Sequence, residues 1–95
     1  MSIEHAKCLG VVDGAMFILE GGQTVTLADV RAPRMGLPGG SAMRTILQRH
    51  VQDREITYEQ IGVDRSGFPS VSASANNQDL SAIMKQALID YGYVD

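Results

Sequence analysis

The sequence lacks several residue types on which particular folds and sites depend. Its 95 residues include one cysteine and no tryptophan, which excludes a disulfide framework and a metal site built from several cysteines. No apolar run approaches the ~18 residues that a membrane-spanning helix needs, and residues 1–7 lack the basic and then apolar pattern of a secretory leader. We therefore expect a reduced, soluble, cytoplasmic protein that has no membrane partner.

An excess of basic residues is also absent. Eight lysines and arginines stand against eleven acidic residues, so the formal net charge is -3. Proteins whose main function is to bind nucleic acid usually carry a basic excess, so the composition argues against that class and leaves room only for a local basic patch. The length suits a single domain, residues 1–95, with one modest hydrophobic core. The 44% hydrophobic content is typical of globular proteins.

The first third of the chain has the residue pattern of a three-stranded meander. The predicted strands cover residues 6–12, 16–20 and 24–30. Asp13-Gly14 and Gly21-Gly22 are turn dipeptides that separate them, and Pro33 marks the end of the third strand. Because tight turns join consecutive strands, we expect these strands to pair antiparallel.

The rest of the chain alternates between helical and strand patterns. The predicted helices cover residues 41–52 and 80–91, the predicted strands 55–61 and 68–74, a predicted turn 64–67, and a polar loop 76–79. Ser41 is placed as the N-cap of the first helix, and either Asp79 or Ser81 caps the second. Gly92 stands where a glycine ends a helix.

The predicted element order is therefore β-β-β-α-β-β-α. Five short antiparallel strands with a helix after the third fit a small, partly open barrel of the OB type. We predict a mainly β fold with two helices, built as an OB-like five-stranded barrel. Cys8 falls in the first strand, where we expect a buried thiol that behaves as a small apolar residue. Such a fold does not by itself fix a function.

Five fragments of the chain, in this order, resemble those of one known family. They are Val11-Val12-Asp13-Gly14-Ala15-Met16, Thr26-Leu27-Ala28-Asp29-Val30-Arg31-Ala32-Pro33-Arg34, Gly40-Ser41-Ala42, Asp64-Arg65-Ser66-Gly67-Phe68, and the segment from Leu80 to Gly92. The ordered set is similar to the staphylococcal-nuclease-like (thermonuclease) family, and the resemblance covers about residues 6–94. Members of that family fold as an OB-like barrel, which agrees with the element order predicted from periodicity.

The resemblance places the family's catalytic positions on residues of different chemistry. The family's enzyme is a calcium-dependent phosphodiesterase, and its two metal carboxylates correspond to Ala15 and Arg31. Its general base corresponds to Arg34, and its two phosphate-binding arginines correspond to Thr26 and Phe68. The resemblance therefore implies a degenerate member of the family, without catalytic residues, metal or cofactor, that is not an enzyme.

Arg31 and Arg34 flank a proline at the rim of the predicted barrel, where the family binds its substrate, and two interpretations of them stay open. In the first, Arg31 forms an ordinary surface ion pair with Asp29. In the second, the planar guanidinium groups bind phosphate or carboxylate. Arg65 in a later turn is expected to join such a site, and Phe68 is the residue best suited to stack on a base.

Three functions are consistent with these observations. We predict a non-catalytic binding module that acts by protein interaction or self-association, which the net negative charge and the lack of a basic stripe favour. The first alternative is a weak binder of nucleic acid, nucleotides or another anion through Arg31 and Arg34. The second is a calcium-dependent nuclease with atypical ligands, against which the loss of both metal carboxylates argues.

We predict that the chain has no calcium site at the position of the family's metal. Ala15 and Arg31 replace two carboxylates, and an arginine about 5 Å from a divalent cation repels it by about 7 kcal/mol at an effective dielectric constant of about 20. Calorimetric titration of the folded chain with calcium is expected to detect no binding tighter than millimolar. Tighter binding that Asp13→Ala abolishes would contradict the prediction.

Overall fold

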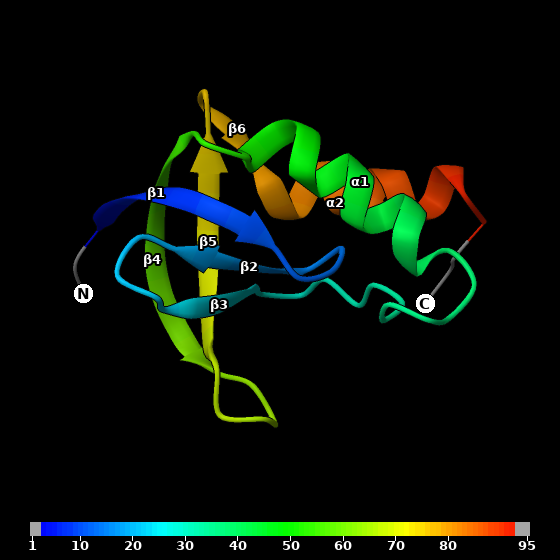
Figure 1. The fold of residues 1–95 in the computed structure, drawn as a ribbon, viewed down its shortest axis with the longest axis horizontal. Helices are drawn as coiled ribbons and strands as arrows, with labels where there is room; N and C mark the ends of the chain where they lie inside the picture. The colour runs from blue at the N-terminus through cyan, green and yellow to red at the C-terminus, as the bar shows by residue number, and fades with distance from the viewer. Residues whose placement is uncertain (1–2, 93–95) are drawn as a thin grey trace.

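The computed structural model of the chain describes residues 3–92. Its elements are β1 (Glu4–Val11), β2 (Met16–Leu19), β3 (Thr24–Leu27), α1 (Gly40–Val51), β4 (Glu55–Val63), β5 (Pro69–Ala75), β6 (Gln78–Asp79) and α2 (Leu80–Asp90) (Figure 1). The predicted order is confirmed except at residues 76–79, which were expected to form a loop. There, Asn76 and Asn77 form a turn with positive φ, and the two residues of β6 pair with the end of β5.

Five of the strands close into a barrel. Hydrogen bonds join neighbours in the order β3-β2-β1-β4-β5, and β3 also pairs with β5, which closes the ring. The closing pair is parallel, with Thr26 opposite Ser70 and Leu27 opposite Val71, whereas the other strand pairs of the barrel are antiparallel. The fold is thus the predicted OB-like barrel with two helices, but the expectation that all its strands pair antiparallel is wrong for β3 and β5.

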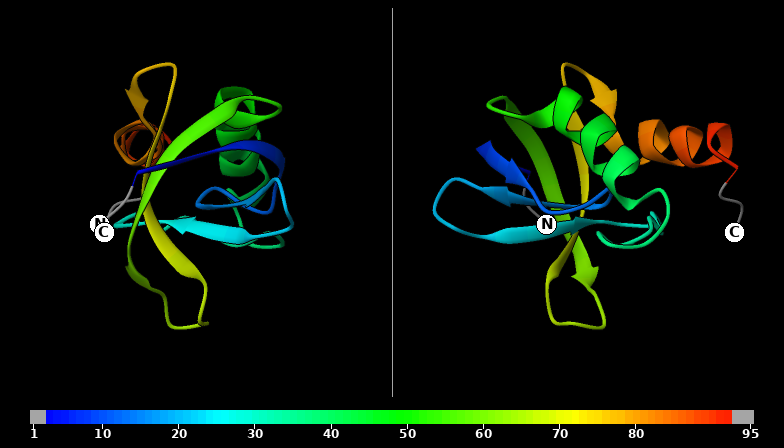
Figure 2. Two further views of the ribbon diagram at one scale, coloured as in Figure 1. Left: turned by 90° about the vertical axis from the view of Figure 1, so that its left-hand side faces the viewer. Right: turned by 45° about the vertical axis from the view of Figure 1, so that its right-hand side comes forward.

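One hydrophobic core fills the barrel and continues beneath the helices. Alternate residues of β2 and β3 point inward, which buries Phe17, Leu19, Val25 and Leu27. The helices contribute buried side chains three or four residues apart, namely Met43, Leu47, Val51, Leu80, Met84 and Leu88. Figure 2 shows both helices at the opposite end of the barrel from the turn between β4 and β5. No helix among the residues described is long and apolar enough to cross a membrane.

Cys8 is fully buried in β1, as expected. Its Sγ donates a hydrogen bond to the carbonyl oxygen of Gly10 at 3.4 Å. Burial raises the pKa of the thiol above its ordinary value, because an ionised sulfur is poorly solvated in an apolar interior. The thiol is therefore neutral at physiological pH and has the low reactivity of a structural cysteine.

Two element boundaries on either side of Arg31 and Arg34 differ from the predictions. β3 ends at Leu27 rather than at residue 30, because Asp29 adopts a φ of 62° and interrupts the extended backbone. α1 begins at Gly40, after an N-cap at Gly39 with a φ of 84°, so the placement of Ser41 as N-cap is wrong. No side-chain hydrogen bond caps this helix, because the cap position falls on a glycine two residues before the position that the sequence pattern indicated.

The start of α2 distinguishes between the two predicted caps. The Asp79 side chain accepts a hydrogen bond from the N–H of Ala82 at 3.3 Å, so Asp79 is the N-cap. The Ser81 hydroxyl instead donates to the carbonyl oxygen of Ala28 at 3.1 Å and ties the helix to the end of β3. Gly92 has a φ of 84° just beyond the helix, which confirms its predicted role.

We predict that α2 is essential to the stability of the fold. Leu88 is 7% exposed, so Leu88→Ala is expected to lower the free energy of unfolding by about 2–5 kcal/mol, a large part of the stability of a small domain. Urea unfolding followed by circular dichroism measures this change. Ile89→Ala is the matched control, because Ile89 is 59% exposed on the same helix. A loss below ~1 kcal/mol for Leu88→Ala would mean that α2 is peripheral.

Candidate binding surfaces

Arg31 and Arg34 lie in the segment between β3 and α1, residues 28–39, which is called the arginine loop below. Their side chains are exposed, as are those of Met35 and Leu37. Two consecutive turns shape the second half of the loop. The N–H of Leu37 donates to the carbonyl oxygen of Arg34 at 3.1 Å, and the N–H of Gly40 donates to that of Leu37 at 3.0 Å. The second half of the arginine loop is therefore a pair of turns that leads into α1.

Two glycines allow the arginine loop to pack closely against its neighbours. A Cβ atom at Gly14 would lie 2.5 Å from the Cβ of Met43 and 2.9 Å from the Cβ of Ala32. A Cβ atom at Gly40 would collide with the carbonyl oxygen of Arg34. Neither glycine has a positive φ. Glycine is therefore needed at these positions because a larger side chain would not fit, and not because of the backbone conformation. The backbone of the loop is held by this packing at two points, while its arginine side chains stay at the surface.

Between residues 3 and 92, the arginine loop forms no ion pair that would explain its charges. Within residues 3–92, Arg44 is the one arginine whose side chain forms a hydrogen bond; its Nε donates to the carbonyl oxygen of Val11 at 2.9 Å. The side chains of Arg31 and Arg34 form none with these residues. Asp29, the expected partner of Arg31, lies in a left-handed turn after β3, and no Asp29–Arg31 ion pair forms. The two residues therefore do not share a strand face, which was the premise of that pairing.

Arg65 and Phe68 belong to the turn between β4 and β5, residues 64–68. The Asp64 carboxylate accepts hydrogen bonds from the N–H groups of Ser66, at 2.9 Å, and Phe68, at 2.8 Å, and Gly67 adopts a φ of 88°. Arg65 is exposed, and Phe68 is 36% exposed. In the three views of Figures 1 and 2, this turn projects from the end of the barrel and stands apart from the arginine loop. The structure thus brings Arg65 and Phe68 together, and Arg31 and Arg34 together, on separate segments.

Ala15, which the sequence resemblance aligned with a metal carboxylate of the thermonuclease family, is part of the hydrophobic core and is 7% exposed. Its N–H donates to the Asp13 carboxylate at 2.8 Å, and its carbonyl oxygen accepts from the N–H of Leu27 at 2.7 Å. Asp13 therefore stabilises the turn between β1 and β2, as its position before Gly14 predicted. Among residues 3–92, no three histidine, cysteine or acidic side chains gather in an arrangement suited to a metal ion.

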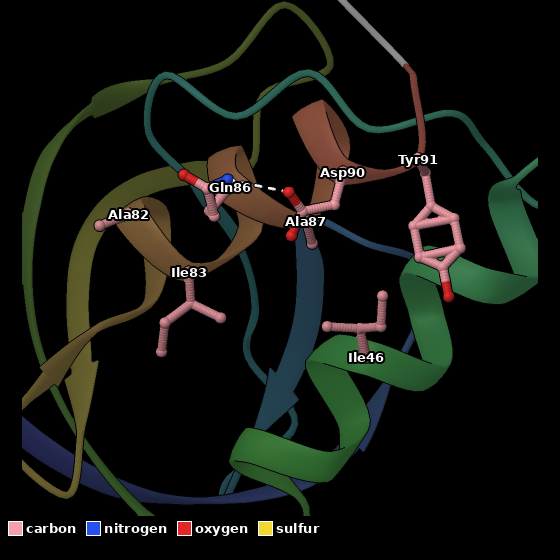
Figure 3. A pocket seen from close by; sticks show the side chains of 7 residues that line it. All are labelled: Ile46, Ala82, Ile83, Gln86, Ala87, Asp90 and Tyr91. Carbon is pink, nitrogen blue, oxygen red and sulfur yellow. Dashed lines mark hydrogen bonds between the residues drawn. The ribbon is translucent and has the colours of Figure 1, made fainter.

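A third surface, which the sequence did not predict, is an open apolar groove between α1 and α2. It has a volume of about 520 Å³ and is called the helix groove below; its lining residues are Ile46, Ala82, Ile83, Gln86, Ala87, Asp90 and Tyr91. Figure 3 shows Ile46 and Ile83 pointing toward each other from the two helices, with the ring of Tyr91 at one end of the space. Gln86 and Asp90 lie along the rim, where the Gln86 Nε2 donates to the Asp90 Oδ1 at 2.9 Å.

The helix groove arises because each helix carries more apolar side chains than the core can cover. Ile83 and Ala87 of α2 and Ile46 of α1 are only partly buried at the edge of the core, and Tyr91 is 55% exposed. All four lie three or four residues from a buried residue of the same helix, the spacing of one helical face. They lie next to the fully buried residues of each helix and form a second row of apolar side chains that the core covers only in part. An apolar row wider than the buried one was the signal in the sequence that could have indicated this groove.

Comparison with known proteins adds no functional assignment. The chain matches no model of a known protein family, and no curated protein matches it at a significant level. The arrangement of its own residues is therefore the basis on which a function is proposed.

Proposed function

We propose that the chain is a non-catalytic binding module that acts by interaction with another protein. The observation that carries this proposal is the helix groove, a shallow, open apolar groove of about 520 Å³ on a folded domain. Concave sites lined mainly by apolar side chains, with a few polar groups at fixed positions, are typical binding sites. Here Asp90, Gln86 and the Tyr91 hydroxyl supply the polar groups.

The residues at the family's catalytic positions support a non-catalytic role. Ala15 is buried in the core, and Arg31 and Arg34 are cations in the places of a metal ligand and a general base. Metal-assisted attack on a phosphodiester needs carboxylates to hold the cation and a base to activate water. These side chains therefore favour binding over phosphodiester cleavage as the function of the domain.

The proposal is tested by finding a partner and then locating its binding surface. The purified chain is cross-linked in an extract of its source, and a captured protein is purified and titrated calorimetrically against the wild type. Ala87→Gln, which places a longer polar side chain in the helix groove, is expected to weaken that binding by about tenfold. Lys85→Gln, an exposed position on α2 that does not line the groove, is the matched control and should leave the affinity unchanged.

Metal-dependent cleavage of DNA or RNA by the purified chain would contradict the proposal, as would the absence of any captured protein that binds again in purified form. A partner that binds equally to Ala87→Gln and to the wild type would keep the interaction function and move it to another surface.

A second candidate function is weak binding of anions through the arginine loop. The observation that favours it is that Arg31 and Arg34 are both exposed on a loop whose backbone is held by close packing at Ala32 and Arg34. Arginines on a loop with a fixed backbone bind phosphate or carboxylate with a smaller loss of conformational freedom than arginines on a mobile loop.

We predict that a labelled single-stranded oligonucleotide binds the chain weakly at low salt and that the affinity falls as salt is added. Arg31→Ala/Arg34→Ala is expected to weaken binding and to reduce the slope of log affinity against log salt by about 1.4, because two fewer phosphates are neutralised and each contributes about 0.7 to the slope for a single strand. Fluorescence anisotropy measures both quantities. Arg65→Ala, which removes an exposed arginine from the turn between β4 and β5, is the control and is expected to have a smaller effect on both quantities. No binding by the wild type at low salt, or an equal effect of Arg65→Ala, would refute a role for the arginine loop.

A further inference from the structure

The helix groove indicates the chemistry of the partner as well as its place. We propose that the groove binds an amphipathic helix of a partner protein that presents aliphatic side chains flanked by lysine or arginine. This inference rests on the proposed protein-interaction function and narrows it to one class of partner. Three features of the groove carry it, namely its helical walls, its apolar floor and the sign of its charge.

The walls of the groove favour a helical occupant. Two helices pack side by side, and Ile46 on one and Ile83 and Ala87 on the other leave a furrow between them (Figure 3). A third helix packs into such a furrow by placing its side chains between the rows of the first two. Side chains three and four residues apart on the incoming helix then enter the groove together, which is the usual mode of helix-in-groove recognition.

The floor of the groove favours aliphatic anchors. Ile46, Ile83 and Ala87 are partly buried aliphatic residues that border the core, so an aliphatic side chain placed on them removes apolar surface from water on both partners. The ring of Tyr91 at one end offers further apolar contact and a hydroxyl at its tip. Small Ala82 and Ala87 leave the space that a leucine or isoleucine side chain would occupy.

The charge of the groove favours a basic partner. Asp90 is the charged residue among those that line it, and no lysine or arginine does so. One Asp90 oxygen accepts the hydrogen bond from Gln86, which orients the carboxylate at the rim and leaves its second oxygen for a cation. The lysine and the arginines of the two helices, Lys85, Arg44 and Arg49, are not among the lining residues. A lysine or arginine beside the aliphatic anchors therefore meets a complementary charge.

The same charge argues against a second copy of this chain as the occupant. A symmetric contact places the same patch of both copies face to face. Two grooves in contact would bring two Asp90 carboxylates to one interface without a cation from either groove, and like charges across an interface are unfavourable.

The experiment compares three synthetic helical peptides that share one length and differ at a few positions. The basic peptide has leucine along one face and lysine at both ends, the acidic peptide has glutamate in place of lysine, and the polar peptide has serine in place of leucine. Their binding to the full chain is measured by fluorescence anisotropy. The wild type is expected to prefer the basic to the acidic peptide by about fivefold and not to bind the polar peptide.

Two variants locate the binding. Asp90→Lys is expected to reverse the preference, so that the acidic peptide binds more tightly, and a lysine at a helix C-terminus is compatible with folding. Ala87→Gln is expected to weaken the binding of both leucine peptides by about tenfold. Lys85→Gln, on the same helix outside the groove, should change neither affinity nor preference, and circular dichroism confirms that each variant is folded.

Equal binding of the basic and acidic peptides, retention of the wild-type preference in Asp90→Lys, or no binding of any peptide would overturn the inference. Binding of a small alkylamine to the groove without binding of the basic peptide would also overturn it, because the groove would then serve a small molecule. A captured natural partner that binds away from the groove would refute this inference while leaving the interaction function in place. The absence of any protein partner would refute both.

Discussion

The parallel pairing of β3 with β5 is the contact on which the other surfaces of this domain depend. It closes the barrel at Thr26–Ser70 and Leu27–Val71, and it extends one residue further, where the N–H of Ala28 donates to the carbonyl oxygen of Val71 at 2.9 Å. The carbonyl oxygen of Ala28 then accepts the hydroxyl of Ser81. One short stretch of backbone thereby fixes where the arginine loop leaves the barrel and where α2 begins.

This closure also explains why the ends of several elements could not be predicted from local sequence. Val30 continues the alternation of the third strand, and nothing nearby indicates that the strand stops at Leu27. The stop arises because Ala28 is held by residues of β5 and α2, more than forty positions away, and Asp29 turns the chain with a positive φ. Contacts so distant in sequence leave no periodic trace that a single sequence reveals.

Features that depend only on neighbouring residues were predicted better than those that depend on distant contacts. The turn at Asp13-Gly14, the two helices and a cap at Asp79 or Ser81 are each set by neighbouring residues, and the structure has the turn, both helices and the cap at Asp79. The candidate surfaces were less predictable. The arginine loop was singled out because Arg31 and Arg34 stand where the family that the sequence resembles has acidic residues. The helix groove was missed because helical periodicity places Ile46 and Ile83 on apolar faces but does not show how much of each side chain the core covers.

The C-terminal part of β4 is an exposed strand edge with an irregular backbone. In the described part of the chain, the pairing of β4 with β1 ends at Tyr58, while β4 continues with β5 as far as Val63. Ile61 and Val63 are both more than half exposed there, which would make a regular edge prone to pair with another chain. The register shift between Gln60 and Gly62 is a β-bulge, which breaks the even spacing of backbone donors and acceptors. An irregular edge is a poorer template for pairing with another strand than a regular one, so apolar side chains can stay at the surface here at a lower risk of edge-to-edge association.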